Sequence, residues 1–354
     1  MYNRFSSILL QWHKQNKRSL PWKKTKDPYL TWLSEIILQQ TQIIQGLPYY
    51  EKIMARYPTV KHLADANLAE LMKLWEGLGY YSRARNLHYT AKYVSYELNG
   101  VFPGTYDELL KLKGVGAYTA AAIASFSYDL PHAVVDGNVF RVLSRIFGIK
   151  QPIDSTEGKK YYTRLANEFI DKKHPAAYNQ AIMDFGATVC TPKQPKCIAC
   201  PFTKKCVAKR TGKIEFYPVK LKKLVKKTRY LNYLVIQYKD KICLNYRTGN
   251  DIWKNLYDFP VIETSSNSTK NIITKSKEWK KLFVGLKLEI RAISDDFTQQ
   301  LSHQTIKAKF YNILINKHLR GEHHFIFVSK KQVMQKAFPK IILNYLKTIS
   351  NFKD

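Results

Sequence analysis

Two acidic residues have neighbours that suit them to acid–base chemistry. Glu35 lies in an apolar stretch in which Leu30, Leu33 and Ile37 have helical spacing. A carboxyl group surrounded by apolar side chains keeps its proton to higher pH, so Glu35 could act as a general acid. Asp136 stands just before a second helical stretch, where the helix dipole favours the ionised carboxylate. Taken alone, Glu35 is more often a solvated surface residue and Asp136 an ordinary helix cap.

Four of the five cysteines lie close together, with the spacing C-x6-C-x2-C-x5-C. They are Cys190, Cys197, Cys200 and Cys206. In an intracellular protein such a set indicates metal ligands rather than disulfides. Four tetrahedral thiolates suit either zinc or a [4Fe–4S] cluster, and the spacing alone does not choose between them.

A pair of glycines predicts a site for an anion. Gly114 and Gly116 flank Val115, and we expect a tight turn with positive φ at both glycines, followed at once by an alanine-rich helix. The bare N–H groups and the positive end of the helix dipole would then face one point, which suits a phosphate. Any tight turn would also account for these glycines by themselves.

Two further clusters combine polar and aromatic side chains near the ends of predicted helices. Side-chain amides and tyrosine rings could enter a base stack, and an arginine beside them could neutralise phosphate. The residues concerned are Gln39, Gln40, Thr41, Tyr80, Tyr81 and Arg83. A pair of core tyrosines explains Tyr80 and Tyr81 equally well.

The chain is strongly basic. Its 354 residues include 58 Lys and Arg against 27 Asp and Glu, a formal charge of +31. This excess indicates a polyanionic partner, most simply a nucleic acid, with a membrane surface as the alternative. No apolar run approaches the length that spans a membrane, and Ile8–Leu10 is too short an apolar core for a signal peptide. We therefore expect an intracellular protein, long enough for two domains.

Periodicity predicts helices in the first part of the chain and strands in the last. Helices are expected from Phe5 and Pro28 and over Tyr49–Tyr57, Leu68–Leu74, Tyr161–Phe169 and Tyr178–Phe185. Residues 213–229 are strongly basic, which is typical of a linker that follows phosphate. Strands are expected at Leu231–Tyr238, Lys241–Tyr246, Leu288–Ile293, Lys307–Ile315 and His324–Val328, before a last helix at Lys340–Ile349.

The run from Ser34-Glu35 to Gln39-Gln40-Thr41 closely resembles adenine DNA glycosylases of the MutY family. The glycine hairpin and Asp136 resemble the endonuclease III superfamily, which contains that family. The resemblance implies a mainly α helix-hairpin-helix glycosylase fold with an α+β Nudix-like C-terminal domain, and one [4Fe–4S] cluster on the four cysteines. It places a six-helix barrel module at 27–132, an iron–sulfur module at 1–26 and 133–212, a linker at 213–229 and the Nudix-like domain at 230–354.

The resemblance also implies roles for single residues. Glu35 would protonate the leaving purine, Asp136 would stabilise the cationic sugar or bond to it transiently, and Asn138 would orient Asp136. Bifunctional relatives have a lysine where this chain has Tyr118, and a phenol cannot form the imine that leads to strand cleavage. Tyr118 would instead support the sugar. Asp184 would contact the adenine, with a structural helix acid as an equally good explanation.

The C-terminal part of the chain is expected to recognise the damaged base. Trp253–Pro260 resembles the Nudix-like domain of the family, but the glutamate-dense metal motif of true Nudix hydrolases is absent, so pyrophosphate cleavage is not expected. The family's recognition loop carries an aromatic residue, a serine and a histidine, and here the matching residues are Leu301, Ser302 and His303. A leucine can still intercalate. Tyr80 is the expected wedge beside the lesion.

These features together lead to one expectation about function. We expect a monofunctional adenine DNA glycosylase of base excision repair that acts as a monomer, in the bacterial cytoplasm on the nucleoid. Its substrate would be double-stranded DNA with adenine opposite 8-oxoguanine or guanine. The alternatives are a bifunctional endonuclease III-like glycosylase with AP lyase activity, a Nudix-type nucleotide hydrolase, and a non-catalytic DNA-binding module.

Overall fold

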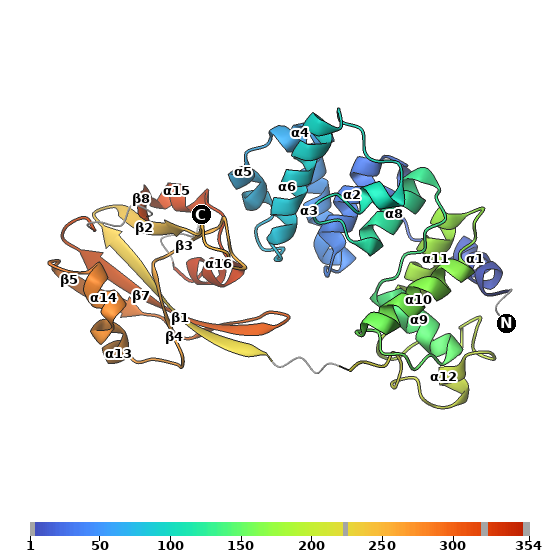
Figure 1. Cartoon of the computed structure of the whole chain (residues 1–354). Helices are drawn as coiled ribbons and strands as arrows, with labels where there is room; N and C mark the ends of the chain where they lie inside the picture. The colour runs from blue at the N-terminus through green and yellow to red at the C-terminus, as the bar shows by residue number, and fades with distance from the viewer. Residues whose placement is uncertain (1–3, 222–225, 320–324, 350–354) are drawn as a thin grey trace. The chain divides into compact units, whose positions relative to one another are not determined.

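The computed structural model describes residues 4–221, 226–319 and 325–349 (Figure 1). The chain divides into two compact units, and neither of them is continuous in sequence. The first unit consists of Met1–Asp65 and Tyr89–Lys223, and the second of Ala66–His88 and Leu224–Asp354. Helix α6 (Ser82–Lys92) spans the division. The second unit therefore combines a short helical segment with the C-terminal part of the chain.

The first unit is helical. Its elements are α1 (Phe5–Gln15), η2 (Pro21–Lys24), α2 (Pro28–Leu38), α3 (Ile43–Arg56), α4 (Val60–Asp65), the π-helical turn η3 (Tyr93–Glu97), α7 (Tyr106–Leu109), α8 (Ala117–Tyr128), α9 (Gly137–Phe147), α10 (Thr156–Phe169), α11 (Pro175–Thr188) and α12 (Val207–Arg210). The predicted helices are confirmed, although α3 begins at Ile43 rather than Tyr49. None of the described helices is long and apolar enough to cross a membrane.

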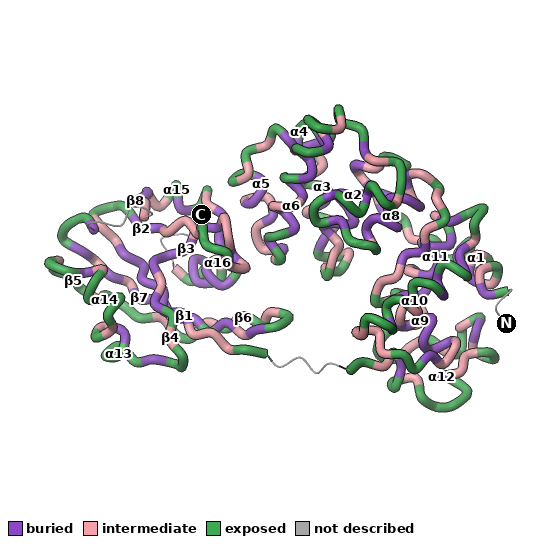
Figure 2. The backbone as a smooth tube through the Cα atoms, viewed as in Figure 1, coloured by how far each residue is buried: buried purple, intermediate pink, exposed green. Residues whose placement is uncertain are grey.

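The core of the first unit explains how its helices are placed. The apolar stripe of α9, formed by Val139, Val142, Leu143 and Ile146, is fully buried, as its helical spacing predicts. It belongs to one hydrophobic cluster with Phe5 of α1 and with residues of α8, α10 and α11, and Figure 2 shows buried segments on all of these helices. Because α11 packs against α1, α8 and α9, the N-terminal ends of α8 and α9 are held in one region.

The second unit is built on an eight-stranded sheet with the order β3-β2-β1-β7-β5. The strands are β1 (Lys227–Tyr238), β2 (Lys241–Tyr246), β3 (Tyr257–Asp258), β4 (Val261–Thr264), β5 (Leu288–Ile293), β6 (Phe297–Gln300), β7 (Gln304–Ile315) and β8 (Phe325–Ser329). β1 and β7 pair in parallel, with Tyr233 opposite Phe310, and the other pairs are antiparallel. The helices are α5 (Leu68–Leu74), α13 (Lys270–Lys275), α14 (Lys277–Leu282), α15 (Lys330–Met334) and α16 (Lys340–Leu346).

The predicted linker is shorter in the structure. β1 begins at Lys227, so the last residues of the predicted linker belong to the sheet. At the other end, the backbone of Ile153 donates 3.0 Å to the carbonyl of Val219, and the backbone of Leu221 donates 2.9 Å to Asp154. The last helix ends at Leu346 rather than Ile349. The first residue of the strand predicted from His324 lies outside the described residues.

Candidate active site

Glu35 lies near the end of α2, a helix whose start is fixed by two residues. Asp27 caps it by accepting a hydrogen bond of 2.8 Å from the backbone of Tyr29, and Pro28 occupies the first helical position, where its missing N–H costs nothing. Glu35 is only 7 % exposed because almost every face of this part of α2 is buried. Burial raises the pKa of Glu35 to about 7. Glu35 is therefore partly protonated at neutral pH, as a general acid must be.

Asp136 is the N-cap of α9. Its Oδ1 accepts hydrogen bonds of 2.9 and 2.8 Å from the backbone N–H groups of Asn138 and Val139, and its Oδ2 accepts 2.7 Å from the Asn138 side-chain amide. Burial nevertheless raises the pKa of Asp136 above its ordinary value, although these hydrogen bonds act in the opposite direction. That Asp136 stays ionised remains a prediction, which the backbone N–H groups at the start of α9 favour and burial opposes. The carboxylate depends on its hydrogen bonds to stay charged.

Tyr118 lies close to both Glu35 and Asp136. It lies in the first turn of α8, its hydroxyl forms a hydrogen bond with the Glu35 side chain, and the Met183 sulfur lies 3.4 Å from the same oxygen. Burial first, and then the nearby charges of Glu35 and Asp136, raise the pKa of Tyr118 well above its usual value. Tyr118 therefore stays a neutral phenol. The three side chains come from α2, α8 and the start of α9, and they form one group in which Glu35 is buried and Tyr118 and Asp136 are half-buried.

Asn138 and Arg141 fix the orientation of Asp136. The Arg141 guanidinium donates 2.8 Å to the Asn138 side-chain oxygen and 2.7 Å each to the carbonyls of Gly186 and Cys190. The Asn138 amide nitrogen must consequently face Asp136. Gly186 permits this close packing of α9 and α11, because a Cβ there would stand 2.6 Å from the Cβ of Asn138. The sequence analysis missed Arg141, although its position one turn after Asn138 was a usable signal.

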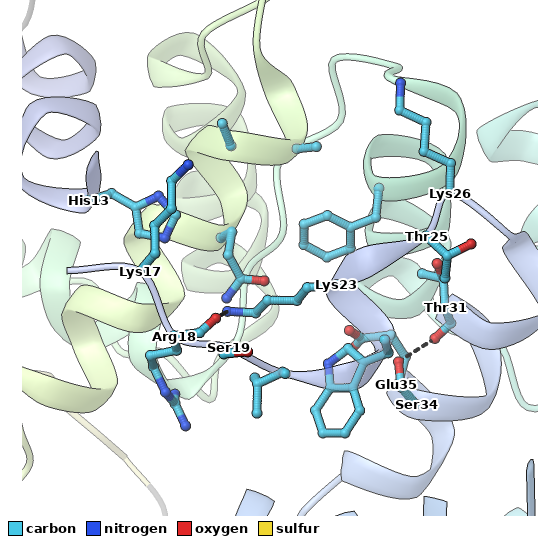
Figure 3. A pocket seen from close by; sticks show the side chains of 16 residues that line it. His13, Lys17, Arg18, Ser19, Lys23, Thr25, Lys26, Thr31, Ser34 and Glu35 are labelled. Carbon is cyan, nitrogen blue, oxygen red and sulfur yellow. Dashed lines mark hydrogen bonds between the residues drawn. The ribbon is translucent and has the colours of Figure 1, made fainter. Parts of the chain in front are cut away.

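A cavity of about 700 Å³ adjoins Glu35 (Figure 3). Trp22, Thr31 and Ser34 line it near Glu35, and a basic set consisting of His13, Lys17, Arg18 and Lys23 lines it as well. Figure 3 shows Lys23 between the His13–Arg18 side and the Glu35 side. The sequence analysis did not single out the basic set, because residues 16–27 have no helical or strand periodicity that would place them.

Asp184 contacts three residues of the basic set but is not among the residues that line the cavity. Its carboxylate lies 3.2 Å from His13, 3.4 Å from Arg18 and 3.0 Å from Lys23. The side chain is 1 % exposed, and these cations keep the pKa of Asp184 below its ordinary value even though burial opposes them. These contacts agree with the structural acid that the sequence left as its alternative, and the contact of Asp184 with adenine stays a prediction.

The four cysteines of the predicted metal site line one small cavity in the first unit, with Arg145 on its wall. Arg145 Nη1 lies 3.7 Å from the Cys190 sulfur and donates 2.7 Å to the carbonyl of Thr191, and the Cys206 sulfur lies 3.2 Å from the Arg145 carbonyl. Among the described residues, no group of three or more His, Cys, Asp or Glu side chains is close enough to hold a metal. The thiols are thus gathered around one space without being in ligand geometry.

The residues expected to contact a phosphate or a base in the first unit lie near α2 and α8. Gly114 has φ +83°, as predicted, but Gly116 caps α8 with φ −96°, so positive φ was wrong for the second glycine. Gln39 donates 3.1 Å to the Thr119 hydroxyl, which holds one amide at the end of α2 against the start of α8. Gln40 is exposed and left-handed at φ +54°, and Thr41 donates 3.3 Å to the carbonyl of Gln39.

The remaining candidate residues lie in the second unit, where they differ in exposure and contacts. Tyr80 is 40 % exposed, and its hydroxyl forms a hydrogen bond with Ser302 in the loop between β6 and β7. In that loop Leu301 is half-buried and His303 is exposed. Tyr81, in contrast, is 4 % exposed and donates 3.3 Å to the carbonyl of Phe338, so it is a core tyrosine.

Arg83 also differs from its expected role. It is 7 % exposed, it lies over the rings of Trp75 and Tyr80 and it donates 3.2 Å to the carbonyl of Gly79. Burial lowers the pKa of Arg83 to about 10. The guanidinium of Arg83 therefore supports the turn that carries Tyr80, and its contact with phosphate stays a prediction.

Comparisons with known proteins find relatives among DNA repair enzymes. The profile of the family described as "HhH-GPD superfamily base excision DNA repair protein" matches residues 33–172. An adenine DNA glycosylase of Buchnera aphidicola subsp. Baizongia pistaciae is 36 % identical over 88 % of this chain and 86 % of its own length. The mouse adenine DNA glycosylase is 44 % identical over 58 % of this chain and 41 % of its own length.

Solved structures show a similar fold for the helical part. A thermostable thymine-DNA glycosylase has a TM-score of 0.56 at 29 % identity, and covers 59 % of this chain and 97 % of its own. A non-covalent endonuclease III–DNA complex has a TM-score of 0.53 at 22 % identity, and covers 60 % of this chain and 98 % of its own. The expected helix-hairpin-helix glycosylase fold is confirmed by these likenesses.

Proposed function

The chain belongs to the adenine DNA glycosylase family, and from that premise we propose that it is a monofunctional enzyme that hydrolyses the bond between adenine and deoxyribose in double-stranded DNA. The observation that carries the proposal is the group formed by buried Glu35 and half-buried Tyr118 and Asp136, beside a cavity that Glu35 also lines. The formal charge of +31 supports a DNA partner. We place the enzyme in the bacterial cytoplasm on the nucleoid, acting as a monomer.

The reaction follows from the state of the two acids. The target nucleotide must leave the base stack, which costs about a few kcal/mol. Glu35, with a pKa of about 7, then donates its proton to the departing purine. The sugar becomes oxocarbenium-like, and the Asp136 carboxylate stabilises it or bonds to it transiently, as a carboxylate does in glycoside hydrolysis. Tyr118 lies beside both acids and supports the cationic sugar.

Tyr118 supports the monofunctional assignment. It occupies the position where bifunctional relatives have a lysine, and its hydroxyl remains a neutral phenol because its pKa is raised. Such a group cannot form an imine with the sugar. Borohydride added during turnover should therefore trap no covalent enzyme–DNA adduct, and strands should break only after alkali. A trapped adduct would establish the bifunctional alternative.

We assign the choice of opposite base to the second unit, where Tyr80 meets Ser302. Leu301, Ser302 and His303 would contact 8-oxoguanine or guanine opposite the adenine, with Tyr80 as the wedge. The test is release of free adenine from duplexes with adenine opposite 8-oxoguanine, guanine or thymine. Equal rates on all three would overturn the assignment. Binding to mispairs without release of free adenine would instead indicate a non-catalytic DNA-binding module. Release of pyrophosphate from oxidised dGTP would indicate a Nudix hydrolase.

We also propose that Cys190, Cys197, Cys200 and Cys206 hold one [4Fe–4S] cluster. The chemistry of the donor set supports this proposal, because four thiols line one cavity and Arg145 lies near the Cys190 sulfur. Bound there, the cluster supplies thiolate–iron bonds that tie the loop to α12. Within the chain, Arg145 holds the loop by donating to the carbonyls of Thr191 and Pro192.

Replacing Cys200 by serine is expected to abolish the visible absorbance of the purified protein and to destabilise the first unit, because the loop loses a covalent cross-link. Iron content, absorbance and thermal unfolding measure this. Cys243 is buried in the second unit and lies outside this set, so Cys243→Ser is the matched control and should retain iron. Full iron content in Cys200→Ser would contradict the assignment.

Replacing Arg141 by lysine is expected to slow adenine release by about 10- to 100-fold, because lysine cannot hold Asn138 and two carbonyls together. As the Asn138 amide becomes free to turn, the pKa of Asp136 should rise further. The acidic limb of the pH–rate profile should therefore move to higher pH. Arg164→Lys, on the exposed face of α10, is the control and should leave the profile unchanged. If Arg141→Lys slowed adenine release but left the acidic limb of the pH–rate profile unchanged, Arg141 would not act by positioning Asp136.

A further inference from the structure

The turn between α5 and α6, which carries Tyr80, has an unusual backbone. Its φ angle is +89° at Gly77, +80° at Gly79 and +48° at Tyr80. Glycine adopts such angles freely, but a residue as bulky as tyrosine does so only where its surroundings hold it. Two donors hold the turn from within, because Trp75 Nε1 donates 3.1 Å and Arg83 donates 3.2 Å to the carbonyl of Gly79. The direction of Tyr80 therefore depends on contacts that fix this turn.

Glu76 ties the same turn to the C-terminal part of the chain. Its Oε1 accepts a hydrogen bond of 2.8 Å from the backbone N–H of Phe338, and its Oε2 accepts 2.7 Å from Lys73. The Lys73 ammonium group also donates 2.9 Å to the carbonyl of Lys336. The Glu76 side chain is only 15 % exposed, so these charge-assisted hydrogen bonds are largely shielded from water. We call the pair Lys73 and Glu76 the clasp.

The segment that the clasp holds is part of the core of the second unit. Phe338 is 1 % exposed, and the backbone of Tyr257 in β3 donates 2.8 Å to the carbonyl of Ala337. At the other end of the turn, the Tyr80 hydroxyl is hydrogen-bonded to Ser302 in the loop between β6 and β7. The turn is thus attached to the second unit twice, at its base through the clasp and at its tip through Ser302.

We propose that Lys73 and Glu76 are positioning residues that set the preference for the base opposite the adenine, because the clasp holds Tyr80 against Ser302. The inference rests on the proposed function for what Tyr80 and Ser302 contact. Without the clasp the turn is free to take other conformations, and DNA binding must then supply the free energy that orders it again. That cost falls on the base pair that Tyr80 and Ser302 recognise, so the preference for this pair decreases.

The first test measures duplex binding to the full-length protein. The duplexes contain adenosine opposite 8-oxoguanine, guanine or thymine, with a 2′-fluorine that disfavours the cationic sugar and keeps the base attached. Glu76→Ala should lower the preference for 8-oxoguanine over thymine by about tenfold. Glu76→Gln should lower it less, because the amide oxygen still accepts from Phe338 although the charge that pairs with Lys73 is lost. Glu278→Ala removes an exposed glutamate from α14 of the same unit and should leave the preference unchanged.

The second test asks whether Glu76 acts through Tyr80. Tyr80→Phe removes the hydroxyl that meets Ser302, so adding Glu76→Ala or Glu76→Gln to it should cause little further loss of preference. Losses that add would assign Glu76 a general stabilising role and would overturn the inference.

Two other results would also overturn it, namely an unchanged preference in both Glu76 variants and a parent protein with no preference to position. Thermal unfolding checks that the variants fold, and Glu76→Gln decides if Glu76→Ala does not. Adenine release is measured separately. A parent that prefers 8-oxoguanine in binding but releases no adenine would contradict the proposed function and leave the clasp supported or overturned by the binding results.

Discussion

Replacement of Glu35 by glutamine is expected to lower the rate of adenine release by about 10² to 10⁴-fold, the usual contribution of general acid catalysis. Glutamine keeps the shape and the hydrogen bond to Tyr118 but has no proton of suitable pKa to give to the purine. The rate should be measured in single turnover, with enzyme in excess over a duplex containing one mispaired adenine, so that product release does not mask the chemical step.

The controls for this variant separate chemistry from binding and folding. Glu51→Gln removes an exposed carboxylate from α3 and should keep the parent rate. Duplex affinity of Glu35→Gln should stay close to that of the parent, because the side chain is buried and remains neutral. If Glu35→Gln released adenine at the parent's rate, the proton would have to come from elsewhere, and the mechanism proposed for Glu35 would fail.

Replacement of Asp136 by asparagine is expected to slow adenine release by about 10² to 10³-fold, because a preorganised charge that stabilises the developing cation is lost. Asparagine is as good an N-cap as aspartate, so α9 should still form and the variant should fold. Asp171 accepts hydrogen bonds from the backbone of Lys173 and His174 in a similar capping geometry. Asp171→Asn is therefore the matched control, and its rate should equal that of the parent.

The two acids together set the pH dependence of the parent enzyme. Glu35 must be protonated, so the rate should fall as the pH rises through its pKa of about 7. Asp136 must be ionised, so the rate should also fall at acid pH, at a value above the ordinary aspartate pKa because burial has raised it. Glu35→Gln should lose the alkaline limb. An unchanged alkaline limb in that variant would assign this titration to another group.

Local sequence was enough to identify both acids. The apolar neighbours of Glu35 predicted its burial, and the helical stripe after Asp136 predicted its capping position. Both signals lie within one or two helical turns of the residue concerned. The direction of the Asp136 pKa was not predictable in this way, because it depends on packing against residues that are distant in sequence.

The sequence did not predict the surroundings of residues that are placed by tertiary contacts. Arg83 follows an exposed tyrosine and looked available to phosphate, yet its guanidinium is covered by Trp75 of the same turn. Tyr81 is buried against Phe338, more than two hundred residues away. The basic set around Asp184 was missed because it forms only when α1 and the turn before α2 pack beside α11. No periodicity in residues 16–27 encodes that packing.

The hydrogen bonds of Arg145 have a consequence for where the chain could be truncated after the cysteine loop. The guanidinium that holds the cysteine loop also donates 3.1 Å to the carbonyl of Ile214 and 3.2 Å to that of Tyr217. A fragment that stops at residue 212 would leave this buried cation with unfilled hydrogen-bonding capacity. Only a fragment that extends past Tyr217 keeps these acceptors in place, so a truncation should fall after the basic segment has begun.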